Sequence, residues 1–174
     1  MLSESDPRTR TSAQREYHGF REMAAPASAR RTDTYQLLRQ NREQLNSAIA
    51  GLSLDKMVVP VIDEWSVKDI LTHITSWEEL ILLDLQRIQR GRQPARYHSG
   101  NESWNPLLMH GRRSFPLDQV LAEFAEVHDA LTGLLDALDD GLIAGEVTVI
   151  CNVLAMHDWE HAREIRAWRD RNGI

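Results

Sequence analysis

The sequence predicts an all-α fold: a four-helix bundle in residues 32–174, preceded by a disordered N-terminal tail in residues 1–31. Apolar residues recur at the period of an amphipathic helix in four long segments, and turn-forming Gly, Pro and Asn gather between them. A chain of 174 residues, 42% of them hydrophobic, is long enough for one packed core and too short for two ordinary domains. Two short connections and one longer crossover between the four helices indicate a compact bundle.

The first two helices are predicted on either side of a short connection. The first covers residues 34–52, and Gly51 near its end is typical of a helix terminus. The second begins at Ser66, because Ser66 and Asp69 form the Ser-x-x-acid pattern of a helix start. Its apolar residues continue at helical spacing through residue 88.

A loop and two further helices are predicted in the second half of the chain. Residues 91–106 form the loop, followed by one or two helical turns in residues 107–113. The third helix covers residues 116–138, with proline in its first turn. The fourth follows Gly145 and ends near residue 171. Its residues 147–150 are locally β-prone, but the helical spacing that follows them favours a helix.

Composition excludes several classes of protein. Residues 1–31 lack the sustained apolar period of a packed element, which is typical of a disordered tail. Met23 opens a run of small residues within this tail and is a candidate start of translation. No signal-type or membrane-spanning apolar segment is present, so we expect a cytoplasmic protein without membrane contact. The net charge of −6 argues against a nucleic-acid partner. The single cysteine, Cys151, excludes an internal disulfide, and its apolar helical stripe favours a packed, inert thiol.

Three histidines indicate chemistry. His157 and His161 are four residues apart on one predicted helix, so both imidazoles can point at one metal ion. His73 lies on the apolar side of the second helix and would meet them if the two helices are neighbours. His128 borders the apolar stripe of the third helix and is the substitute ligand. The other histidines lie in the tail or near the loop: His18, His98 and His110.

The residue pattern alone leaves two interpretations of these histidines equally open. One is a shared metal ion. The other is a set of three separate core histidines, each hydrogen-bonded to a nearby Asp or Glu.

Two separated motifs resemble a known family. Residues 65–78 read W-S-V-K-D-I-L-T-H-I-T-S-W-E, which strongly resembles the W-S-x-K-D-x-x-x-H-x-x-x-W-E stretch of the DinB-like four-helix bundle superfamily, particularly its ClbS/DfsB branch. His157-x-x-x-His161, followed by E-I-R-A-W in residues 164–168, resembles the C-terminal signature of that superfamily. The resemblance covers roughly residues 33–171 and implies a bundle of DinB-like type.

The resemblance implies a metal site and a class of reaction. In the superfamily, one His on the second helix and two on the fourth bind a divalent metal, and these roles carry over to His73, His157 and His161. Zinc suits three neutral imidazoles best, and nickel and iron tolerate the same ligands. Relatives include thiol-dependent transferases and isomerases, and proteins that open the electrophilic ring of a genotoxin. No catalytic side chain is assigned, because the chemistry is expected at water or a thiolate in an open metal position.

Further residues are candidates for supporting this site. Asp158, Glu160 and Glu78 are close enough in sequence to bind the unliganded imidazole nitrogens, although helix-surface charges of this kind are more often simply solvated. Trp77 flanks His73 and is a candidate pocket residue, although core packing explains it equally well.

The loop supplies one more candidate pair. Trp104 and Asn105 resemble a Trp-Asn pair of the ClbS-like branch and are candidate pocket residues, with loop anchoring as the alternative role.

Three functions remain open from the sequence. The leading hypothesis is a metal-dependent enzyme that acts on an electrophilic small molecule by hydrolysis or by transfer of a low-molecular-weight thiol, for detoxification or self-protection. The second is a non-catalytic protein that binds and sequesters a small molecule. The third is a homodimer whose outer helical surface is an interaction site.

Overall fold

The computed structural model describes residues 31–95, 104–139 and 142–174. Most of these residues belong to four long helices: α2 (Arg31–Ile49), α4 (Val67–Gln89), α6 (Leu117–Ala137) and α8 (Thr148–Asn172). Shorter elements connect them: α3 (Leu54–Met57), β1 (Pro60–Ile62), β2 (Trp65–Ser66), α5 (Asn105–Arg112) and the π-helical turn η3 (Ile143–Val147), which leads directly into α8.

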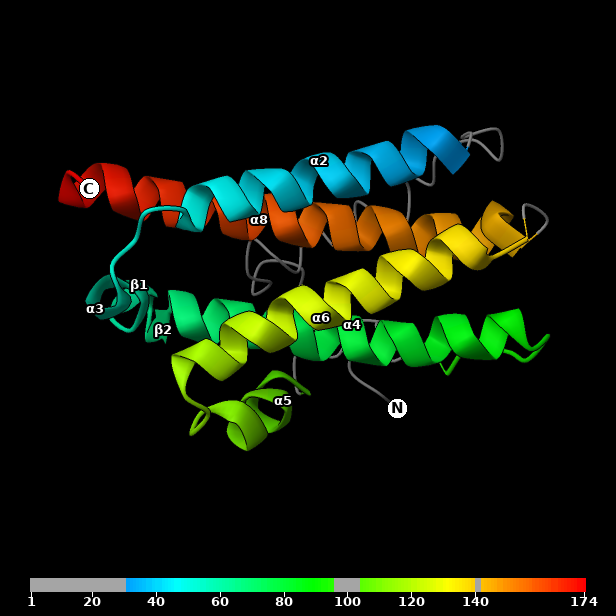
Figure 1. The fold of residues 1–174 in the computed structure, drawn as a ribbon, viewed down its shortest axis with the longest axis horizontal. Helices are drawn as coiled ribbons and strands as arrows, with labels where there is room; N and C mark the ends of the chain where they lie inside the picture. The colour runs from blue at the N-terminus through cyan, green and yellow to red at the C-terminus, as the bar shows by residue number, and fades with distance from the viewer. Residues whose placement is uncertain (1–30, 96–103, 140–141) are drawn as a thin grey trace, which may run out of the picture.

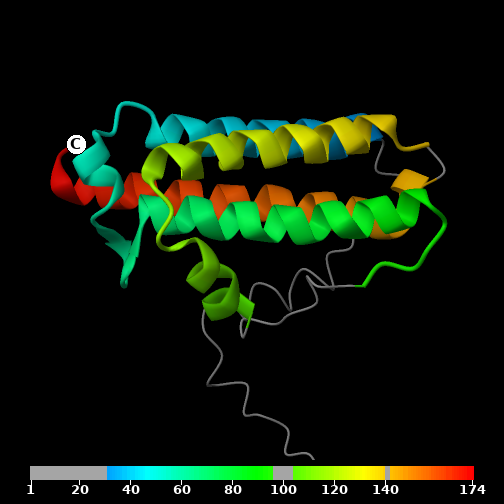
Figure 2. The same ribbon diagram turned by 60° about the horizontal axis from the view of Figure 1, so that its bottom comes forward.

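The four long helices pack in two parallel pairs. α2 packs along α8, α4 packs along α6, and the two pairs run in opposite directions (Figure 1). The connection between α4 and α6 returns the chain to the end of the bundle where α4 began, so these two helices share a direction. In the turned view, α4 and α8 lie side by side in the lower layer, with α2 and α6 above them (Figure 2).

The predicted all-α architecture is confirmed for the described part of the chain. Each predicted long helix is present, with ends that differ from the prediction by no more than about three residues, as is usual for helix termini. The predicted tail lies outside the described residues except for Arg31, which begins α2. Within the described ranges, no helix is long and apolar enough to cross a membrane.

The sequence did not predict a small hairpin between α3 and α4. Strands β1 and β2 pair antiparallel, and Asp63 in the turn has φ of 48°, a left-handed conformation that Asp tolerates well. The hairpin leads into the predicted start of α4: Ser66 Oγ accepts a hydrogen bond from the Asp69 amide at 3.1 Å, and the Asp69 carboxylate accepts one from the Ser66 amide at 2.9 Å. This reciprocal capping box fixes where α4 begins.

The apolar core consists of two clusters with a polar layer between them. On α2, Leu38 belongs to one cluster and Leu45 to the other, and the buried Arg42 lies between them. On α8 the two clusters follow in the same order along the chain. On α4 and α6, which run in the opposite direction, they follow in the reverse order, so each cluster lies at one end of the bundle. One polar residue from each long helix occupies this layer: Arg42, Glu78, His128 and Asp158.

Cys151 is expected to resist alkylation in the folded protein. It is fully buried in the first apolar cluster, and burial raises the pKa of its thiol to about 12, so the reactive thiolate is scarce at neutral pH. Mass spectrometry after treatment with iodoacetamide should show unmodified native protein, and complete modification once guanidinium unfolds the chain. Rapid labelling of the native protein would show that this part of the core opens readily.

Candidate metal centre

Three imidazoles from two neighbouring helices converge on one point. The Nε2 atom of His157 on α8 lies 2.8 Å from Nε2 of His73 on α4 and 3.1 Å from Nε2 of His161 on α8. The three ligand atoms all lie within 4.8 Å of one another. His73 is buried, and the other two side chains are partly buried. The one-turn spacing on α8 and the contact with α4 therefore bring together the three residues that the sequence singled out.

The geometry of this triad and the lowered pKa values of two of its imidazoles fit a small divalent ion. A tetrahedral zinc ion with Zn–N bonds of 2.0–2.1 Å holds its ligand nitrogens about 3.3 Å apart, so only a small opening of the triad is needed. Burial lowers the pKa of His73 and of His157 well below the usual value, and the nearby imidazoles lower it further. Neutral imidazoles keep the lone pairs that a metal requires.

Aromatic side chains hold the His73 ring in place. The ring centroid of Trp65 lies 4.9 Å from that of His73, and the centroid of Trp77 lies 6.4 Å away, both in edge-on arrangements. Trp65 comes from the hairpin, and Trp77 is one helical turn beyond His73 on α4. The His73 Nδ1 atom is buried and has no hydrogen-bond partner in the described part of the chain. Packing, more than hydrogen bonding, therefore sets the direction of this ring.

The outer nitrogen of His161 has a polar partner. Its Nδ1 atom lies 2.7 Å from a carboxylate oxygen of Glu164, one turn further along α8. The Glu164 side chain is about one third exposed, at 32%, and that of His161 is 13% exposed.

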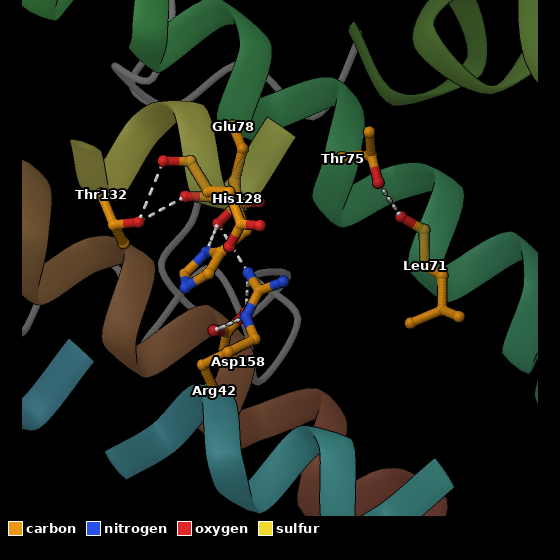
Figure 3. A network of polar contacts seen from close by, with 8 residues as sticks. Arg42, Leu71, Thr75, Glu78, His128, Thr132 and Asp158 are labelled. Atoms are coloured by element: carbon orange, nitrogen blue, oxygen red, sulfur yellow. Dashed lines mark hydrogen bonds and ion pairs between the residues drawn. The ribbon is translucent and has the colours of Figure 1, made fainter. Parts of the chain in front are cut away.

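The polar layer is a second cluster of ionisable groups. Arg42 donates from Nη2 to Glu78 at 2.6 Å and from Nε to Asp158 at 2.8 Å (Figure 3). His128 Nδ1 lies 2.8 Å from the same Glu78 oxygen, so the network joins all four long helices. The Arg42 guanidinium also lies 4.3 Å from the centre of the Phe124 ring. Burial raises the pKa of the Asp158 carboxyl to about 6, against the attraction of Arg42.

Comparison with known proteins assigns the family. A family model described as the DinB superfamily matches residues 37–165, which is most of the chain. The chain belongs to the DinB superfamily. Members of the superfamily often bind a divalent metal, and the triad of this DinB chain could hold one. No curated protein and no solved structure matches the chain.

Two of the residues predicted to bind the outer nitrogens of the histidine triad lie in the polar layer instead. Asp158 and Glu78 bind Arg42 in the polar layer, which corrects the prediction that they support the ligand imidazoles. Neighbouring residues on a helix point about 100° apart, so Asp158 faces the bundle centre where His157 faces α4. Glu160 lies partly buried on α8, and its role stays a prediction. The sequence reasoning missed Glu164, although its i+3 spacing from His161 would have signalled it.

The substitute ligand lies outside the triad. His128 occupies the polar layer with Glu78, so it does not replace His73 at the convergence of the Nε2 atoms. His110 is exposed on α5, and His18 and His98 lie outside the described residues.

The predicted pocket residues form an anchor between α4 and α5. Trp77 donates from Nε1 to the side-chain oxygen of Asn105 at 3.0 Å, and this contact fixes the start of α5 against α4. Trp104, directly before α5, is 36% exposed. The Asn105 contact agrees with the anchoring role considered from the sequence, and substrate contact by these three residues stays a prediction.

Proposed function

We propose that this DinB-superfamily chain is a metal-dependent enzyme of the ClbS/DfsB type that acts on a reactive electrophilic small molecule. The observation that carries the proposal is the convergence of the Nε2 atoms of His73, His157 and His161. The reaction is transfer of a low-molecular-weight thiol or hydrolysis. Zinc is the proposed metal, with nickel and iron as the alternatives.

The side chains of the site have separate tasks in this proposal. The imidazoles of His73, His157 and His161 would hold the ion, and a site with only three protein ligands would leave room for water or a thiol. A divalent ion of this kind supplies Lewis acidity, which favours deprotonation of water or of a thiol at neutral pH. Trp65 and Trp77 pack around His73, so they keep this side of the site apolar and restrict the entry of water. The burial of His73 and His157 keeps both imidazoles neutral and ready to bind.

Turnover of electrophiles by zinc-loaded protein tests the proposal. The substrates are an epoxide and an activated aryl chloride, each offered with water alone, glutathione, cysteine or coenzyme A. We expect catalysis that requires the metal and disappears in the variant His73→Ala/His157→Ala/His161→Ala. Cys151→Ala is the matched control and should retain full activity, because its thiol is buried in the first apolar cluster and is not part of the triad.

Two outcomes would contradict this function. Activity retained by the variant that lacks all three imidazoles would place the chemistry elsewhere. Tight binding of an electrophile without turnover, together with a metal that alters only the melting temperature, would favour a sequestering protein.

A further inference from the structure

We propose that Glu164 is a positioning residue of the metal centre, which acts through His161. Its carboxylate accepts a hydrogen bond from the Nδ1–H group of His161 and thereby directs the Nε2 lone pair of that ring at the shared ligand point. The inference rests on the metal centre of the proposed function and assigns a role to a residue outside the histidine triad.

The first step of the argument is the tautomer of His161. The Nδ1 atom lies 2.7 Å from Glu164 Oε2, and an ionised carboxylate can only accept hydrogen bonds. Nδ1 must therefore carry the proton. The form of an imidazole that binds a metal is neutral and has one N–H group, so in that form the other nitrogen, Nε2, has a free lone pair. That nitrogen is the one that lies 3.1 Å from Nε2 of His157.

The second step is the direction of the ring. The imidazole of His161 can rotate about its side-chain bonds, and only part of that range points Nε2 at the triad. Glu164 lies one turn beyond His161 on the same face of α8, so its carboxylate holds the opposite edge of the ring. The contact thus fixes both the tautomer and the orientation before a metal binds.

His73 provides an internal contrast. Its outer nitrogen, Nδ1, is buried without a partner among the described residues, and aromatic packing orients its ring. His161 is less tightly enclosed, with 13% of its side chain exposed. The more exposed ligand is therefore the one whose orientation depends on a carboxylate.

The third step is the effect on the ion. A carboxylate that accepts from a ligand imidazole increases the basicity of that ligand, and loss of such partners typically lowers metal affinity roughly 10- to 100-fold. Glu164 would consequently strengthen metal binding.

Zinc affinity measured by competition with a chelator tests the role of Glu164. The full-length variants Glu164→Ala and Glu164→Gln are compared with the wild type and with Asp170→Asn, which removes an exposed carboxylate elsewhere on α8. We expect a loss of about 10- to 100-fold for Glu164→Ala. The loss should be smaller for Glu164→Gln, whose amide oxygen still accepts a hydrogen bond, and Asp170→Asn should bind as the wild type does.

A spectroscopic measurement on the metal-free protein separates positioning from a general structural effect. The nitrogen chemical shifts of the His161 ring should report the Nδ1–H tautomer in the wild type and in Glu164→Gln. In Glu164→Ala they should report a mixture of tautomers, while the melting temperature stays close to that of the wild type.

These measurements distinguish failure of the role of Glu164 from failure of the proposed function. If the wild type binds zinc and Glu164→Ala binds it equally well, the role of Glu164 is wrong and the metal centre stands. A wild-type His161 ring protonated at Nε2 would overturn the role independently of any metal measurement. If the wild type binds no divalent metal, the proposed function fails together with this inference.

Discussion

Replacement of Arg42 by methionine is expected to lower the free energy of unfolding by about 3–5 kcal/mol. Arg42 is buried and is held by two buried carboxylates, those of Glu78 and Asp158. Without its guanidinium, the carboxylates remain between α4 and α8 with much of their charge uncompensated. Their mutual repulsion and desolvation should destabilise the bundle at its centre. Urea denaturation followed by circular dichroism measures the change.

Arg39→Met is the matched control for this prediction. Arg39 also lies on α2, but its ion pair with Asp136 is 3.4 Å long and both side chains are more than half exposed. Exposed pairs of this kind contribute about 0–1 kcal/mol, so the midpoint of denaturation should barely move. An unchanged midpoint for Arg42→Met as well would show that the polar layer adds nothing to stability.

A triple variant tests whether the uncompensated carboxylate charges cause the loss of stability in Arg42→Met. The combination Arg42→Met/Glu78→Gln/Asp158→Asn also removes the two carboxylate charges. It should be more stable than Arg42→Met alone, because the substitutions are coupled through shared contacts. Strictly additive losses would argue against charge repulsion as the cause.

Replacement of His157 by alanine is expected to lower zinc affinity on the order of 100-fold or more, because removal of one imidazole forfeits a large share of the binding free energy. The position matters because His157 Nε2 contacts both other ligand atoms. Chelator competition at neutral pH measures the change.

His128→Gln is the control for the zinc measurement. It removes the imidazole that the sequence offered as a substitute ligand, but it leaves the triad intact. Zinc affinity should be unchanged. If His128→Gln lowered zinc affinity as much as His157→Ala does, the result would indicate that the ion binds in the polar layer.

The sequence predicted the long helices well because each helix buries one continuous apolar stripe. A stripe such as that of α6 has the helical period along its whole length, and this signal outweighs local preferences. The β-prone start of α8 illustrates the point, since the π-helical turn η3 and α8 follow each other without a strand. The hairpin was missed because its strands contain three and two residues, too few for an alternating pattern to be visible.

The site was predictable only where its residues share a helix or a motif. The i+4 spacing indicated His157 and His161, the apolar side of its helix indicated His73, and the motif resemblance then implied a ligand role for all three. Which helices are neighbours depends on tertiary packing, so the sequence could not show that Arg42 on α2 holds Asp158 and Glu78. Closeness in sequence misled the assignment of partners because adjacent helical residues face different directions.

Metal content tests the central claim, that the three imidazoles form a metal centre, most directly. Untagged wild-type protein and the variant His73→Ala/His157→Ala/His161→Ala are incubated with zinc, passed through gel filtration and analysed by inductively coupled plasma mass spectrometry. The convergent Nε2 atoms predict about one zinc ion per wild-type chain and almost none in the variant. A wild-type protein that retains no zinc, and none after the same treatment with nickel or iron, would contradict the claim.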